Sequence, residues 1–225
     1  MGHDVFPSTI DKLEECDYFL AMMLNSYHDP KGLRFNLNAF IQALRNVTFM
    51  LQSEDEKSEG FAAWYEKKQD EMRQNPLLCN FVEARNIVVK REMLETKSHC
   101  FLGLYRGRRM KLAIGGEVPP LVDTAYYLER AKEFLIGFML DEEHSDIGEQ
   151  AGVGRKWIVE AIGPDEVVGH CAEALQAIRQ VVSEAMAMAG GELDPTVELP
   201  DIEQFTVLLE SDLDPTLPEK WGWVD

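Results

Sequence analysis

Residues 36–53 read NLNAFIQALRNVTFMLQS, and no other stretch of the chain indicates its structure as clearly. Its apolar side chains recur every three to four residues, which is the spacing of one buried face of a helix. The stripe consists of Leu37, Phe40, Ile41, Leu44, Val47, Thr48 and Leu51. The sequence therefore predicts a core helix at 36–53.

The same period recurs on both sides of this helix. It predicts further helices at 8–27, 61–74, 76–89, 122–144 and from 164 to about 189. Pro76 fits the first turn of its helix, because the N–H that proline lacks has no helical partner there. Pro30 and Gly32 predict a loop after the first helix, and three glycines between 148 and 154 predict another.

Residues 98–115 show a different pattern. Short apolar runs at 100–105 and 110–114 flank Arg106-Gly107-Arg108-Arg109, and Gly115-Gly116 follows. This spacing favours two short strands joined as a β-hairpin, and the alternatives are a helix extension or a loop.

Together these patterns predict a mainly α protein. We expect a helical bundle at 1–95, a hairpin and connector at 96–118, and an acidic helical region at 119–225 packed on the first part. The Pro-rich end of the chain carries Trp221 and Trp223, which are costly to leave in water. We expect them to dock onto the protein itself, the alternative being a partner.

Composition excludes several classes of protein. Hydrophobic residues make up 45% of the chain, which argues against disorder, and no apolar run is long enough to span a bilayer. No secretory signal is visible, so we expect a cytoplasmic protein without a membrane partner. The widely separated Cys16, Cys79, Cys100 and Cys171 predict reduced core thiols rather than a metal site or disulfides.

Charge is concentrated in the second half. Of a net −18, residues 116–225 carry 24 acidic and 6 basic side chains. Such a surface repels phosphate backbones and disfavours nonspecific nucleic-acid binding. The basic cluster Arg106, Arg108, Arg109 and Lys111 lies in the hairpin, where pairing with the acidic half is favoured over contact with a nucleic-acid backbone.

Two stretches, residues 35–45 and 81–86, resemble two helices of a HEPN domain, and the resemblance covers roughly residues 8–95. It implies a helical bundle that forms a homodimer. Active members of that family cleave RNA without metal through an Arg, the polar residue after it and a His four to six residues beyond the Arg. Arg85 and Asn86 match the first two positions.

The histidine of that motif has no counterpart here. Lys90 lies where it is expected, and the next histidine is His99. Proton transfer near neutral pH suits histidine, whereas a lysine or arginine stabilises phosphate charge but is a poor base. At helical spacing Arg85, Asn86 and Lys90 fit one polar face. The alternative is an Arg85 paired with a carboxylate, and Arg45 has the same ambiguity.

Neither a cofactor nor a metal is expected. Asp141, Glu142, Glu143 and His144, like His170, Cys171 and Glu173, favour a solvated acidic surface over a metal site.

The leading hypothesis is a noncatalytic or weakly active HEPN-like protein that binds a nucleotide, RNA or a protein partner through Arg85, Asn86 and Lys90, with Arg45 as a further candidate. One alternative is a metal-independent ribonuclease in which His99 or a residue of a second subunit replaces the missing histidine. Another is an acidic protein-interaction module. Whether the chain is an enzyme stays open.

Overall fold

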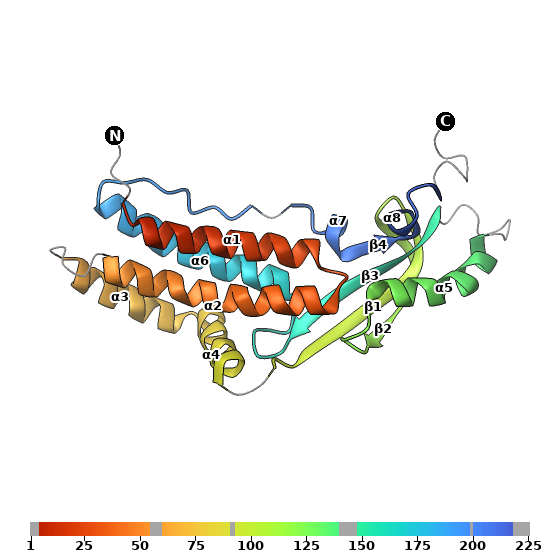
Figure 1. Ribbon diagram of the computed structural model, residues 1–225, viewed down its shortest axis with the longest axis horizontal. Coiled ribbons are helices and arrows are strands. Elements are labelled where there is room, and N and C mark those ends of the chain that lie inside the picture. The colour runs from red at the N-terminus through yellow and green to blue at the C-terminus, as the bar shows by residue number, and fades with distance from the viewer. Residues whose placement is uncertain (1–4, 55–59, 91–92, 140–147, 199, 218–225) are drawn as a thin grey trace. The chain divides into compact units, whose positions relative to one another are not determined.

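A computed structural model describes residues 5–54, 60–90, 93–139, 148–198 and 200–217. The chain is mainly α-helical and includes a four-stranded sheet with strand order β2-β1-β3-β4 (Figure 1). It divides into two compact units, one within residues 1–23, 34–96 and 158–199, the other within 24–33, 97–157 and 200–225. Each unit is assembled from separate stretches of chain, rather than from the consecutive ranges 1–95, 96–118 and 119–225 expected from the sequence.

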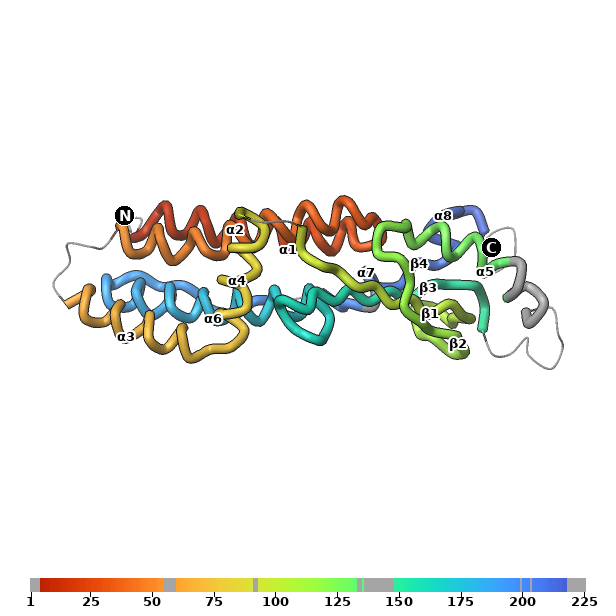
Figure 2. The backbone as a smooth tube through the Cα atoms, turned by 90° about the horizontal axis from the view of Figure 1, so that it is seen from below, coloured from red at the N-terminus to blue at the C-terminus, as the bar shows by residue number. Residues whose placement is uncertain are grey.

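The first unit is built from helices. They are α1 (Pro7–Asn25), α2 (Pro30–Glu54), α3 (Phe61–Gln74), α4 (Pro76–Lys90) and α6 (Val167–Met188), of which α1 and α2 continue into the second unit. Figures 1 and 2 show α1, α2, α3 and α6 lying lengthwise beside one another, with α4 crossing them. The stripe predicted at 36–53 is buried from Leu37 to Leu51. All five helices predicted for this part of the chain are confirmed.

One helix begins earlier than predicted. The loop expected at 28–32 is wrong in its second half, because Pro30 is already the first residue of α2. A proline at that position costs no hydrogen bond, which is the same reason that Pro76 begins α4. Leu33 is buried, so the early start adds a core contact.

The second unit contains the sheet. Strands β1 (Thr96–Arg106) and β2 (Arg109–Val118) form the predicted hairpin, whose turn residue Gly107 has a φ of 55°. Such a φ favours glycine. Helix α5 (Thr124–Met139) contributes Leu128, Ala131 and Leu135 to a core with β1 and β3.

The prediction of a loop at 148–154 is wrong, because β3 covers Gln150–Val159. Gly152 is needed for packing rather than for a turn: a Cβ at this position would lie 2.6 Å from the Tyr105 ring. The sheet ends in β4 (Val207–Leu209), which pairs antiparallel with β3 and lies between the short helices α7 (Glu203–Thr206) and α8 (Glu210–Leu213). The acidic region 119–225 is therefore only partly helical.

A buried aromatic and cationic cluster holds the second unit together. Trp157 is 1% exposed, and its Nε1 donates a 2.9 Å hydrogen bond to the carbonyl oxygen of Tyr27. The Tyr27 hydroxyl donates to the carbonyl oxygen of Arg155, also over 2.9 Å. The Arg155 guanidinium lies 3.8 Å from the Trp157 ring centroid. These contacts tie the α1–α2 turn to β3.

Several sequence expectations concern single residues. All four cysteines are free; Cys16, Cys100 and Cys171 are buried as predicted, but Cys79 is exposed, so its prediction as a core thiol is wrong. Trp221, Trp223 and residues 141–146 lie outside the described residues. No helix among the described residues is long and apolar enough to cross a membrane.

Candidate ligand-binding site

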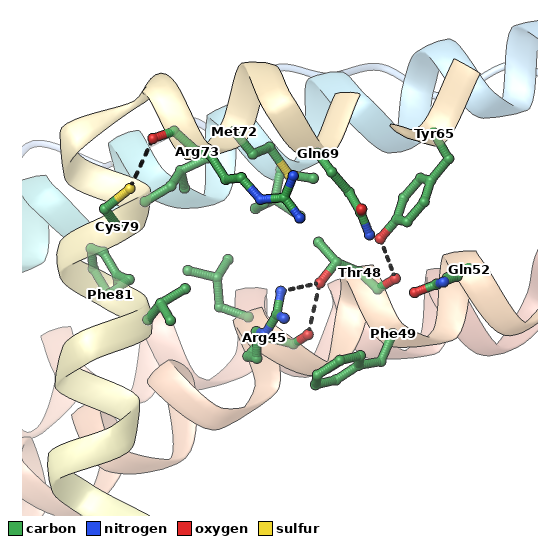
Figure 3. Close-up of a pocket in the computed structure, with 14 residues that line it drawn as sticks. Arg45, Thr48, Phe49, Gln52, Tyr65, Gln69, Met72, Arg73, Cys79 and Phe81 are labelled. Carbon is green, nitrogen blue, oxygen red and sulfur yellow. Dashed lines mark hydrogen bonds between the residues drawn. The ribbon is translucent and has the colours of Figure 1, made fainter. Parts of the chain in front are cut away.

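A cavity of about 320 Å³ opens between α2, α3 and α4 in the first unit. Most of its lining is apolar, including Leu44, Phe81 and Val82. Figure 3 shows polar side chains reaching into it from two walls, with Arg45 on the α2 wall and Gln69 and Arg73 on the α3 wall. An apolar cavity with a few convergent polar groups is the usual form of a small-molecule site.

Arg45 is held in place by its own helix. Its Nη1 donates a 3.1 Å hydrogen bond to Thr48 Oγ1, and its guanidinium carbon lies 4.3 Å from the ring centroid of Phe49. The Thr48 hydroxyl in turn donates to the carbonyl oxygen of Arg45 over 3.0 Å. Within the described part of the chain, no carboxylate forms an ion pair with Arg45. Its positive charge therefore remains available to an anionic ligand.

The opposite wall is polar as well. Tyr65 donates from its hydroxyl to the carbonyl oxygen of Thr48 over 2.8 Å, and burial raises the pKa of this tyrosine. Arg73 forms an exposed ion pair with Asp70 over 2.6 Å. Exposed pairs of this kind are weak, so Arg73 can exchange Asp70 for a ligand at little cost.

Other predicted site residues lie on α4. Arg85 and Asn86 are half-buried and Lys90 is exposed. They lie outside the cavity lining, although Arg85 and Asn86 follow the lining residue Val82 by one helical turn. Lys90 is one turn further. The structure thus brings Arg45 into the cavity and places Arg85, Asn86 and Lys90 along the helix that leaves it.

The ion-pair alternative for Arg85 finds no support among the residues described. No carboxylate there forms a salt bridge with its guanidinium, although Glu83 lies two positions earlier on α4. His99, the suggested replacement for the missing histidine, lies on β1 in the second unit and is paired with Glu117 in the sheet. Arg85 belongs to the first unit.

Two residues of the basic cluster pair with acids in the same unit. Arg108 Nη2 lies 2.7 Å from Asp212 Oδ1, and its Nη1 donates to the carbonyl oxygen of Val207 over 2.6 Å. Arg106 lies 3.4 Å from Glu149. The hairpin is partly neutralised by the acidic half of the chain, as the sequence analysis favoured.

No metal-binding group emerges in the described ranges. No cluster of three or more His, Cys, Asp or Glu side chains in these ranges could hold an ion. His170 Nδ1 lies 3.8 Å from Glu173, while burial raises the pKa of Cys171 well above its ordinary value. A protonated, buried thiol is a poor metal ligand.

The α3 wall was missed by the sequence analysis. Residues 61–74 were interpreted as a helix with an aromatic face, and that helix is confirmed. Its polar members Gln69 and Arg73 follow Tyr65 at intervals of four residues, which is the spacing of one helical face. That spacing was the sequence signal that could have identified Gln69 and Arg73 as site residues.

Comparison with known proteins identifies a family. The family model of bacteriophage lambda protein ea47 matches residues 6–207. The chain belongs to this ea47 family. Protein ea47 of Escherichia phage lambda is 33% identical over 88 residues, which are 39% of this chain and 22% of that protein. The chain therefore covers about a fifth of the length of this relative. No solved structure matches.

Proposed function

We propose that the chain is a noncatalytic or weakly active HEPN-like protein that binds a nucleotide in the α2–α3–α4 cavity. The observation that carries the proposal is the Arg45 guanidinium, stacked on Phe49 at the edge of an apolar cavity and without a carboxylate partner in the described ranges. Arginine binds phosphate through fixed, paired donors, and an apolar wall accommodates a base.

The size of the cavity favours a small ligand. Its volume of about 320 Å³ lies at the lower end of the range for small-molecule sites. The net charge of −18 opposes a long polyanion. A nucleoside monophosphate or a short single-stranded RNA end therefore fits better than an extended RNA.

The face formed by Arg85, Asn86 and Lys90 extends this proposal. From Val82 to Lys90 the helix rises by roughly 12 Å, at about 1.5 Å per residue. A ligand longer than one nucleotide would leave the cavity beside Val82 and meet these side chains. Arg85 then contributes charge and Asn86 hydrogen bonds.

Weak or absent catalysis follows from the side chains present. Among the residues that the structure describes, neither a histidine nor a carboxylate lines the cavity. A ligand there meets phosphate-binding groups, but neither the histidine nor the carboxylate that most often transfers protons near neutral pH.

Calorimetry with adenosine and uridine monophosphates tests the proposal. Arg45→Ala should weaken binding at least tenfold, because it removes the charge that meets the phosphate. Arg130→Ala is the matched control: Arg130 stacks on Tyr126 at 5.5 Å in the second unit and should leave affinity unchanged. Equal affinity of Arg45→Ala and the unsubstituted protein would refute the site.

The ribonuclease alternative needs its own assay. Labelled single-stranded RNA is incubated with the protein in EDTA, and Arg85→Ala is compared at equal helicity by circular dichroism. Cleavage that is lost in Arg85→Ala would replace the binding proposal with a metal-independent ribonuclease. Intact RNA with both proteins agrees with a binding role.

A further inference from the structure

Strand β2 is an open edge of the sheet in the second unit. It pairs with β1 from Arg109 to Val118, and the strand order β2-β1-β3-β4 places no described strand on its other side. The backbone groups of an edge strand that point away from the sheet form a template for pairing with another chain.

The side chains of this strand are unusually apolar for an exposed element. Met110, Leu112 and Ile114 are 52%, 43% and 67% exposed. The register with β1 is interrupted next to Met110 and is regular from Leu112 to Val118. The regular part provides seven consecutive residues for pairing.

We propose that β2 pairs antiparallel with β2 of a second copy of the chain, with the two-fold axis at Ile114. In this register Ile114 faces Ile114 of the other copy, which covers the most exposed apolar side chain of the strand. Lys111 then lies opposite Glu117, and by symmetry this pair of opposite charges occurs twice. Opposite charges directly across two strands stabilise the pairing.

Glycine makes room for the same register. Leu112 lies opposite Gly116, where an added Cβ would meet no atom within 4 Å. The Leu112 side chain can therefore cover the neighbouring backbone. Shifting the centre by one residue, to Ala113, would place Lys111 opposite Gly115 and Arg109 opposite Glu117.

This surface is distinct from the helices that carry the HEPN resemblance, because β2 belongs to the other unit. The inference therefore does not depend on the proposed nucleotide site. Two copies with a charge of −18 each repel one another, so the pairing needs its local complementarity.

Exchange of the charges tests the register. By analytical ultracentrifugation in 0.15 M salt, roughly physiological ionic strength, we expect twice the chain mass of 25.6 kDa. Lys111→Glu and Glu117→Lys should each weaken the dimer about tenfold, and the double variant should restore it. Arg109→Glu is the control, since Arg109 lies opposite Pro119 in this register. A monomeric protein, or a dimer that neither exchange weakens, overturns the proposal.

Cysteine cross-linking tests directly whether the two-fold axis lies at Ile114. In a Cys79→Ser background, which removes the exposed native thiol, Ile114→Cys should form an intermolecular disulfide on oxidation. Directly opposite Cα atoms are about 4.5–5.5 Å apart, within disulfide range. Leu112→Cys is the control, because residue 112 of one copy is displaced by about 13 Å along the strands from residue 112 of the other copy. Cross-linking of Leu112→Cys but not of Ile114→Cys would overturn the register.

Discussion

The guanidinium carbon of Arg45 lies 4.3 Å from the ring centroid of Phe49, one helical turn further along α2. Both side chains line the cavity, and Phe49 is 46% exposed. The ring thus restrains the arginine without burying its charge. A ligand phosphate would meet an arginine whose orientation is already limited, which reduces the entropy lost on binding.

This contact predicts a specific binding defect. Phe49→Leu keeps an apolar side chain but removes the aromatic face, and we expect nucleotide affinity to fall three- to tenfold, equivalent to about 1 kcal/mol. Calorimetry measures the change, and the unfolding free energy should shift by less than about 0.5 kcal/mol because the side chain is exposed. Tyr126→Leu is the matched control. Unchanged affinity would show that stacking plays no part.

The helices were predictable because their signals are local. The stripe from Leu37 to Leu51 depends only on spacing within one helix, and the start of α4 depends on one proline. Strand β3 was not predictable in this way. Gly152 and Gly154 resemble loop residues in sequence, yet they lie against Tyr105, which is distant in the chain.

The candidate site was predictable only in part for the same reason. Arg45 was identified from its position on a core helix, and the structure places it in a cavity. Its partners across the cavity, Gln69 and Arg73, come from α3. Their proximity depends on how helices pack, which helical periodicity does not specify.

A second prediction concerns Arg155, which is 3% exposed. Its guanidinium donates to the Ser98 and Thr124 hydroxyls and to two backbone carbonyls. Arg155→Met leaves these acceptors buried without a donor, at a cost of about 3 kcal/mol. Urea unfolding measures the loss, with exposed Arg130→Met as the control. A loss below about 1 kcal/mol would mean that the remaining groups find other partners.

A third prediction concerns pH. Burial, and after it the positive charge of Arg155, lowers the pKa of His28 to about 4. The unfolded chain, with a histidine pKa of about 6.5, therefore binds more protons than the folded protein between these values. The contribution of His28 to the unfolding free energy is therefore fully present above about pH 7, and it falls as the pH decreases toward 4.

The size of this effect can be measured against a variant. Between pH 7 and pH 5 the His28 contribution to the unfolding free energy should fall by about 2 kcal/mol. His28→Gln lacks this titrating group. Over the same pH interval its unfolding free energy should therefore fall by about 2 kcal/mol less than that of the unsubstituted protein. Parallel pH profiles for the two proteins would show that His28 titrates normally in the folded state.

The last prediction concerns Glu54, the final residue of α2, which binds the beginning of α1. Its carboxylate accepts from the backbone N–H groups of Ser8 and Thr9 over 2.7 and 2.9 Å, and from the Thr9 hydroxyl over 2.7 Å. Burial alone would raise the pKa of Glu54, but these hydrogen bonds outweigh it and lower the pKa. A negative charge at a helix N-terminus also stabilises the helix dipole.

Glu54→Gln keeps the shape of the side chain but removes the charge and one acceptor site. We expect a loss of about 1 kcal/mol at pH 7 by urea unfolding, in the range of an N-cap substitution. Because the folded pKa is lowered, this contribution is present above the unfolded pKa and disappears as the pH falls through the folded value. The difference between the two proteins should therefore shrink in acid. Exposed Glu66→Gln is the control, and a loss equal to that of the control at pH 7 would exclude a capping role for Glu54.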